Sequence, residues 1–244
     1  MAIRVTVWNE FVHEKTDEGV MAVYPDGIHM ALKRMLECDE VQVRTATLEE
    51  EDCGLPQEVL DETDVLIWWG HKRHLMVPDE VVDRVYWRVM NGMGLICLHS
   101  AHDSKVFKRL MGTTCSLRWH EIGEHERIAV IDPAHPICQG LPLHFTIDHE
   151  EMYGERFDIP TPDQLIMLGW FPTGEVFRSG CVWRRGHGKV FYFQPGHETY
   201  GNYNDNECVR TVIRNAVRYV APAQMTQVRT DCIKAEPLEP YKAE

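Results

Sequence analysis

Several features typical of secreted, membrane and redox proteins are missing from this sequence of 244 residues. No apolar run approaches the roughly 18 residues that cross a bilayer. The first residues, MAIRVTVWNE, lack the basic start and apolar stretch of a signal peptide. No two of the eight cysteines form a CxxC pair. These absences predict a cytoplasmic protein with reduced thiols and no membrane segment.

Positive charge is also scarce, because 25 Lys and Arg face 38 Asp and Glu, for a formal net charge of −13. Such an acidic surface repels phosphate backbones, so nucleic-acid binding is disfavoured and a small-molecule partner is favoured. The length suits one large α/β domain and is short for two independent ones.

Apolar strand patterns alternate with helical patterns along most of the chain. Strands are expected at residues 3–8, 41–45, 64–69, 94–98 and 189–193. Helical spacing follows Pro25-Asp26-Gly27 and Pro78, and again after Asp205, which is expected to cap the last helix. This alternation predicts an α/β fold with an open, mostly parallel sheet wound with helices on both faces.

The middle of the chain, from about residue 113 to residue 185, lacks helical periodicity. Short β-like runs at residues 127–131, 144–147, 165–168 and 180–183 are separated by Pro and Gly. We expect antiparallel strands and loops inserted into one α/β domain over residues 1–222. Residues 223–244 form a polar tail, expected to pack along the surface or against a partner subunit, so a homo-oligomer is one prediction.

Polar residues follow the expected strands, at the edge where open parallel sheets bind ligands. They are Asn9, Glu10, His71, His99, Ser100, His102, His197 and Glu198, and the segment 148–151 adds His149. Any one of these histidines could be only a hydrogen-bonded loop residue. Convergence of several at one edge instead predicts a functional site.

Four motifs carry a family resemblance, namely WNEFVHE, WWGHKRH, GLICLHSAH and VFYFQPGHETYGNY. In order and spacing they are similar to motifs of the ThuA family, over nearly all of residues 1–221. That family lies in the class I glutamine amidotransferase-like superfamily, so the resemblance implies a flavodoxin-like sheet. It also implies a role in the use of trehalose or related disaccharides, on oxidised 3-keto sugars.

Glutamine amidotransferases carry a cysteine nucleophile at a strand-to-helix elbow and a later His-x-Glu pair. By resemblance, His99 stands in the place of that cysteine, and His197 corresponds to the later histidine with Glu198 beside it. Glutamine hydrolysis is therefore disfavoured. Cys97 lies two residues before the corner, where we expect a buried structural thiol with a raised pKa. A hydrolase that uses Cys97 or Ser100 is the least favoured alternative.

Histidines can serve as acid and base near neutral pH, which suits the acidic protons beside a keto-sugar carbonyl. We predict catalytic roles for His99, His197, Ser100 and Glu198. Substrate-binding roles are predicted for the other strand-end residues and for aromatic residues that could face sugar rings or belong to the core: Asn9, Glu10, Trp69, His71, His102, His149, Tyr153 and Tyr200.

A divalent metal would strengthen the same chemistry, since imidazole and carboxylate ligands suit zinc or another first-row ion. His99 and His197, with His71 or His149 as the third ligand, form the predicted metal set. A non-catalytic sugar-binding or regulatory protein on the same scaffold is the main alternative to an enzyme, because fold alone does not confer activity.

Overall fold

A single nine-stranded sheet organises the computed structural model, which describes residues 2–239. Its strand order is β2-β1-β3-β4-β9-β8-β7-β5-β6. The first five strands of that order are parallel, and they are rich in β-branched and aromatic residues that suit buried strands. They span Val41–Thr47 (β2), Ile3–Asn9 (β1), Val65–Trp69 (β3), Gly94–Leu98 (β4) and Gly188–Phe193 (β9).

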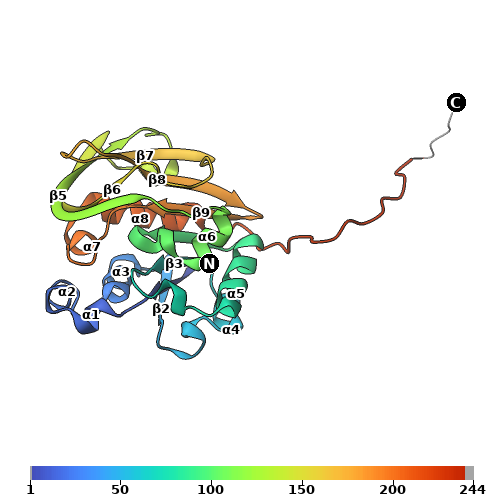
Figure 1. Cartoon of the computed structure of the whole chain (residues 1–244). Helices are drawn as coiled ribbons and strands as arrows, with labels where there is room; N and C mark the ends of the chain where they lie inside the picture. Colours follow the sequence, from blue (N-terminus) through green and yellow to red (C-terminus); the bar gives the residue numbers. More distant parts are fainter. Residues whose placement is uncertain (1, 240–244) are drawn as a thin grey trace.

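The remaining four strands pair antiparallel and continue the same sheet. They are Val176–Arg185 (β8), Gln164–Trp170 (β7), Arg118–Val130 (β5) and His144–Gly154 (β6). In Figure 1 they lie together on one side of the molecule, away from β2 and its neighbours. The sheet is therefore mixed, and the flavodoxin-like detail is not confirmed. The expected antiparallel strands exist, but they are longer than the apolar runs that predicted them.

Helices cover both faces of the sheet, as expected. Helices α3 (Ile28–Leu36) and α8 (Glu207–Val220) pack on one face, and α4 (Gln57–Asp61), α5 (Asp79–Met90) and α6 (Lys105–Met111) pack on the other. The predicted cap of α8 is wrong by one residue. The N-cap residue is Asn206, whose side-chain oxygen Oδ1 accepts the backbone N–H of Val209 at 3.1 Å. This hydrogen bond pairs one of the free N–H groups in the first turn of the helix.

Short helices occupy the loops between these elements. They are α1 (His13–Thr16), α2 (Glu18–Val23), α7 (Asn202–Asp205) and the 3₁₀ turns η1 (Glu51–Gly54), η2 (His74–Met76), η3 (His99–Asp103) and η4 (Pro136–Cys138). None is long enough to show a helical period in the sequence. Within the described residues, the helices are too short or too polar to span a bilayer.

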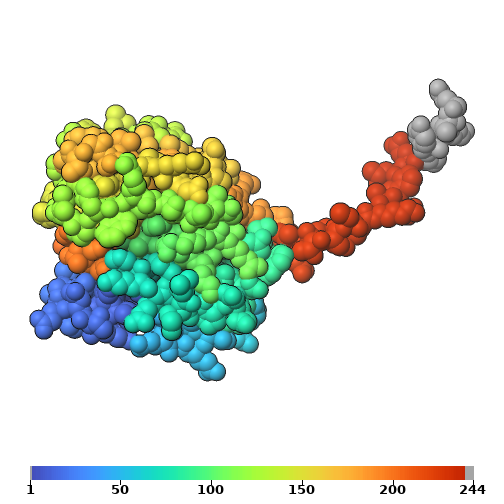
Figure 2. Space-filling model, in the orientation of Figure 1, coloured from blue at the N-terminus to red at the C-terminus, as the bar shows by residue number. Residues whose placement is uncertain are grey.

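The C-terminal segment has no helix or strand from Ala221 to the last described residue, Glu239. Its first part is attached to the body, because the N–H groups of Thr226 and Val228 donate to the backbone and side chain of Asn91 at 2.9 and 2.8 Å. Farther along, it runs away from the body (Figures 1 and 2). Residues 240–244 of the predicted tail lie outside the described residues. The predicted end of the domain at residue 222 stays a prediction.

Candidate active site

The corner after β4 is sharp, because His99 adopts a left-handed backbone conformation with φ 51°. This region is uncommon for residues other than glycine, and such residues cluster at functional sites. The turn places the ring of His99 in a fully buried position. Its Nδ1 lies 2.8 Å from the carbonyl oxygen of Gln194, and its Nε2 lies 2.9 Å from Oε2 of Glu151. Both ring nitrogens therefore face acceptors.

The contact between His99 and Glu151 shifts the pKa values of both groups in the direction that favours an ion pair. Burial lowers the pKa of His99, but the hydrogen bond to Glu151 and the charges of the neighbouring glutamates outweigh it and raise the pKa to about 9. Burial raises the pKa of Glu151, and the hydrogen bond and charge of His99 outweigh that effect and lower it. The hydroxyl of Tyr153 lies 3.2 Å from Nε2 of His99 and completes the pocket around the ring.

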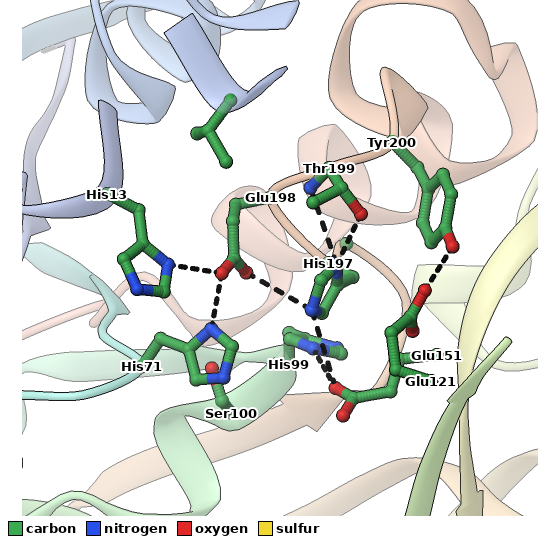
Figure 3. Close-up of polar contacts among 12 residues, drawn as sticks. His13, His71, His99, Ser100, Glu121, Glu151, His197, Glu198, Thr199 and Tyr200 are labelled. Carbon is green, nitrogen blue, oxygen red and sulfur yellow. Dashed lines mark hydrogen bonds and ion pairs between the residues drawn. The ribbon is translucent and has the colours of Figure 1, made fainter. Parts of the chain in front are cut away.

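Glu198 binds two imidazoles through one carboxylate oxygen. Its Oε1 accepts from Nδ1 of His13 and from Nδ1 of His71, the latter at 2.6 Å (Figure 3). Burial raises the pKa of Glu198, but these two hydrogen bonds outweigh it and hold the pKa well below its usual range. Since the proton on Nδ1 of His71 points at the carboxylate, Nε2 of a neutral ring carries the free lone pair.

His197 lies between the two carboxylates. Its Nε2 is 3.6 Å from Oε2 of Glu198 and 3.9 Å from Oε2 of Glu151. Its Nδ1 makes a 2.7 Å hydrogen bond with Oγ1 of Thr199. Burial, followed by the positive charge of His99, lowers the pKa of His197 to about 4. His197 is therefore a neutral imidazole at neutral pH.

Two further buried glutamates fix the loops that carry these rings. The carboxylate of Glu10 accepts the backbone N–H groups of His71, Lys72 and Arg73 at 2.7 to 3.0 Å. The carboxylate of Glu150 accepts the N–H groups of Gly196 and His197 at 2.7 and 3.1 Å. Through these contacts Glu10 holds the His71 loop in place, and its predicted role in substrate binding stays a prediction.

A cavity of about 370 Å³ opens beside the cluster, within the range of small-molecule sites. Polar residues dominate its lining, and Trp119 stands exposed at its rim. His71 and Glu151 line the cavity. His99 does not line it, and its ring contacts Glu151 from the buried side. The lining residues are His71, His74, Ser100, His102, Asp103, Ser116, Leu117, Trp119, Glu151 and Tyr153.

Several predicted site residues line this cavity, and others support it from outside. Ser100, His102 and Tyr153 belong to the lining, although the hydroxyl of Ser100 donates to the carbonyl of Gly70 at 2.8 Å. Asn9 and Trp69 are buried elsewhere. The Asn9 amide bonds Glu14 at 2.6 Å, and the Trp69 indole bonds the carbonyl of Gly196 at 3.2 Å.

His149 and Tyr200 lie apart from the cavity and line a second hollow of about 300 Å³. Their rings stack with centroids 6.0 Å apart, and Nδ1 of His149 bonds the carbonyl of Gly123 at 3.0 Å. The hydroxyl of Tyr200 donates to Glu121. The sequence analysis offered His149 as a possible third ligand beside His99 and His197. In the structure, Glu151 lies beside these two histidines instead.

In residues 2–239, two sets of three side chains could hold a metal ion. One is His99, Glu151 and His197, and the other is His13, His71 and Glu198. Within each set the candidate ligand atoms lie within 4.8 Å of one another. The sequence analysis assigned no role to Glu151 or to His13, although both follow predicted strands. The first was signalled by the polar segment 148–151, and the second by its place just after β1.

Cys97 is fully buried in β4, and burial raises its pKa well above the ordinary value. The expected structural position of this thiol is confirmed. All eight cysteines are free thiols.

Fold and site together define an α/β protein with a histidine–glutamate cluster at the carboxyl edge of its parallel strands. The family model described as ThuA, trehalose utilisation, matches residues 4–220. The chain therefore belongs to the ThuA family, as the four motifs predicted. No curated protein matches the sequence.

Solved structures share this fold at low sequence identity. A ThuA-like protein from Parabacteroides merdae is 16% identical, with a TM-score of 0.67, and the match covers 94% of this chain and 93% of that one. A ThuA-like protein from Bacteroides uniformis is also 16% identical, with a TM-score of 0.66 and coverage of 89% and 91%. A cytoplasmic protein from Salmonella typhimurium is 12% identical, with a TM-score of 0.60 and coverage of 90% and 100%. At these identities the likeness establishes the fold alone.

Proposed function

We propose that this protein is an enzyme of trehalose or disaccharide utilisation that transfers protons on a keto-sugar bound in the 370 Å³ cavity. Membership of the ThuA family supports the substrate class. The observation that carries the reaction type is the His71–Glu198 pair, with Nδ1 of the ring bound at 2.6 Å and the ring itself lining the cavity.

His71 acts as the general base. A carbon beside a sugar carbonyl has an acidic proton, and Nε2 of His71 is free to take it because Nδ1 is occupied by Glu198. The buried carboxylate fixes the tautomer and stabilises the imidazolium that forms, as the acid of a catalytic triad does. Isomerisation and elimination both begin with this proton transfer.

Other cavity residues bind and orient the sugar. The carboxylate of Glu151 offers an acceptor for sugar hydroxyls, and it is held in place by the buried ring of His99. The exposed indole of Trp119 offers an apolar face for a sugar ring at the rim. A cavity lined by polar side chains and by the aromatic rings of Trp119 and Tyr153 suits a neutral, hydroxyl-rich ligand.

Hydrogen exchange tests this proposal whichever product the reaction forms. A 3-keto-disaccharide is incubated with the enzyme in D₂O, and proton NMR follows deuterium entry beside the carbonyl. We expect His71→Asn to slow enzyme-catalysed exchange by about 10²–10⁴-fold, the usual contribution of a general base. His144→Asn, at an exposed histidine on β6, is the matched control and should exchange at the wild-type rate. Unchanged exchange in His71→Asn refutes the assignment.

A thiol or serine hydrolase is a weaker candidate for the same cavity. Cys97 is fully buried and is absent from the cavity lining, and the Ser100 hydroxyl is engaged by Gly70. A cytoplasmic location and assembly into a homo-oligomer belong to the proposal as well, and size-exclusion chromatography with light scattering tests the second.

A further inference from the structure

Three donor atoms from different elements converge beside the cavity. They are Nε2 of His99 after β4, Oε2 of Glu151 on β6 and Nε2 of His197 after β9, all within 4.8 Å of one another. Each residue is at least nine-tenths buried. Two imidazoles and one carboxylate form a donor set that first-row divalent ions favour. Figure 3 shows the three side chains pointing toward one another.

The outer nitrogens of both rings are already anchored. Nδ1 of His99 donates to the carbonyl of Gln194 at 2.8 Å, and Nδ1 of His197 bonds Oγ1 of Thr199 at 2.7 Å. Histidines that bind metals almost always use the second nitrogen in this way, since the contact fixes the tautomer and the ring orientation. Nε2 of each ring faces the shared carboxylate of Glu151, at 2.9 Å from His99 and 3.9 Å from His197. A cation that binds there would replace the proton on Nε2, and the contacts at Nδ1 would keep both rings in place.

The second possible set lacks this support. In His13, His71 and Glu198, both Nδ1 atoms already donate to the carboxylate. In residues 2–239, the hydrogen bonds of these two rings are made by Nδ1, and none is formed at Nε2 that would orient the rings for a metal bound at Nδ1. This distinction selects the His99, Glu151 and His197 set.

An unsatisfied acceptor adjoins the selected set. Oε2 of Glu198 has no hydrogen-bond partner in the described part of the chain, and it lies 3.6 Å from Nε2 of His197. Glu198 is 2% exposed. In residues 2–239, neither Glu151 nor Glu198 forms an ion pair with Lys or Arg, and histidines are their partners. A buried acceptor and buried carboxylates without a permanent cation are costly, and a divalent ion would offset that cost.

We infer that His99, Glu151 and His197 form a site for one first-row divalent cation, with zinc as the best match. Glu151 belongs both to this set and to the cavity lining, so the ion would lie beside the substrate. Its use in catalysis rests on the proposed function, where a cation would polarise the sugar carbonyl. Binding of the ion does not depend on that function.

Zinc binding to the full chain tests the inference. Protein treated with EDTA and dialysed is titrated with Zn²⁺ by calorimetry, and elemental analysis gives the stoichiometry. We expect one Zn²⁺ per wild-type chain and a higher thermal midpoint with Zn²⁺. His197→Asn and Glu151→Gln each remove a ligand and should weaken binding by more than the roughly 10–100-fold typical of an outer-shell change. Thr199→Val, an outer-shell change itself, should weaken it by about 10–100-fold.

Two variants serve as controls. His71→Asn and His144→Asn should bind Zn²⁺ as the wild type does, and circular dichroism confirms that every variant is folded. Loss of binding in His71→Asn with retention in His197→Asn would move the ion to the other set and overturn the inference. Absence of stoichiometric binding by the wild type overturns it outright.

The same variants separate this inference from the proposed function. Normal Zn²⁺ binding with unimpaired deuterium exchange in His71→Asn would leave the metal site standing and remove the general base. If exchange is impaired in His71→Asn but the wild type does not bind Zn²⁺, the general base stands and the metal site is refuted.

Discussion

Replacement of Glu10 by Gln separates two roles for this residue. If Glu10 positions the His71 loop, its loss should destabilise the protein and lower kcat. If it binds substrate, as the sequence predicted, the loss should raise KM and leave stability unchanged. The structure favours positioning, because the carboxylate accepts three consecutive backbone N–H groups, those of His71, Lys72 and Arg73.

The size of the effect follows from those three hydrogen bonds. A bond to a charged acceptor contributes about 1.5–3 kcal/mol, and a neutral one contributes about 0.5–1.5 kcal/mol. Glutamine of the same shape keeps the oxygen and loses the charge, so each bond weakens by about 1 kcal/mol and the three together by about 3 kcal/mol. For a domain of this size, that corresponds to a fall of about 6–12 °C in Tm.

Differential scanning calorimetry measures the fall in Tm, and the exchange assay provides kcat and KM. Glu49→Gln is the matched control, since this exposed carboxylate forms a surface ion pair with Lys15 and should change stability by less than about 0.5 kcal/mol when replaced. An unchanged Tm in Glu10→Gln, together with a raised KM, would refute the positioning role and restore the substrate contact.

Three further outcomes are expected. Glu198→Gln removes the charge that stabilises the imidazolium of His71, so deuterium exchange should slow by about 10²–10⁴-fold while KM for the keto-sugar changes little. Cys97→Ser should keep the wild-type rate of exchange. Urea titrations should show that the free energy of unfolding falls by about 1–2 kcal/mol, because a hydroxyl replaces a fully buried thiol. Complete loss of exchange in a folded variant would restore the thiol mechanism. Burial lowers the pKa of His29 to about 4 from 6.5, so the unfolded chain binds more protons between these values and stability should fall as pH drops from 6.5 toward 4. Urea midpoints at pH 7 and pH 5 should therefore differ less in His29→Asn than in the wild type, and equal differences would contradict this account.

The sequence was sufficient to predict that these histidines meet at one candidate site, because strand ends are visible as apolar runs followed by polar residues. His71, His99 and His197 follow three different strands, and their rings meet with centroids 5.3 to 6.4 Å apart. Parallel strands all end at the same edge of the sheet, so residues that follow them are brought close together. The convergence on which the functional prediction depended is present in the structure.

Individual roles could not be read from the sequence, because they depend on local geometry. Asp148 and His149 are both exposed, and Glu150 and Glu151 after them are both buried, so the two-residue alternation of β6 breaks between them. The pairing of β5 with β6 is irregular in the same region. A strand pattern assigns His149 and Glu151 to one face, and this irregularity separates them. Of the two histidines predicted as the third member of the group, His71 therefore meets His99 and His197, and His149 does not.

Buried carboxylates distinguish this edge of the sheet from an ordinary sheet edge, and their partners show which of them remain charged. Glu126 is also buried with one unpaired oxygen, but its other oxygen accepts from the hydroxyl of Ser179, and burial raises its pKa well above the ordinary value. Burial therefore favours the uncharged form of this carboxyl group. Glu198 instead accepts from two imidazoles and keeps an unpaired oxygen beside a third, His197. Other buried atoms in the described residues also lack a partner, among them Nε1 of Trp68 and Oη of Tyr192, so an unsatisfied atom alone does not identify a site. The oxygen of Glu198 differs from these because it lies beside His197, a member of the proposed metal set.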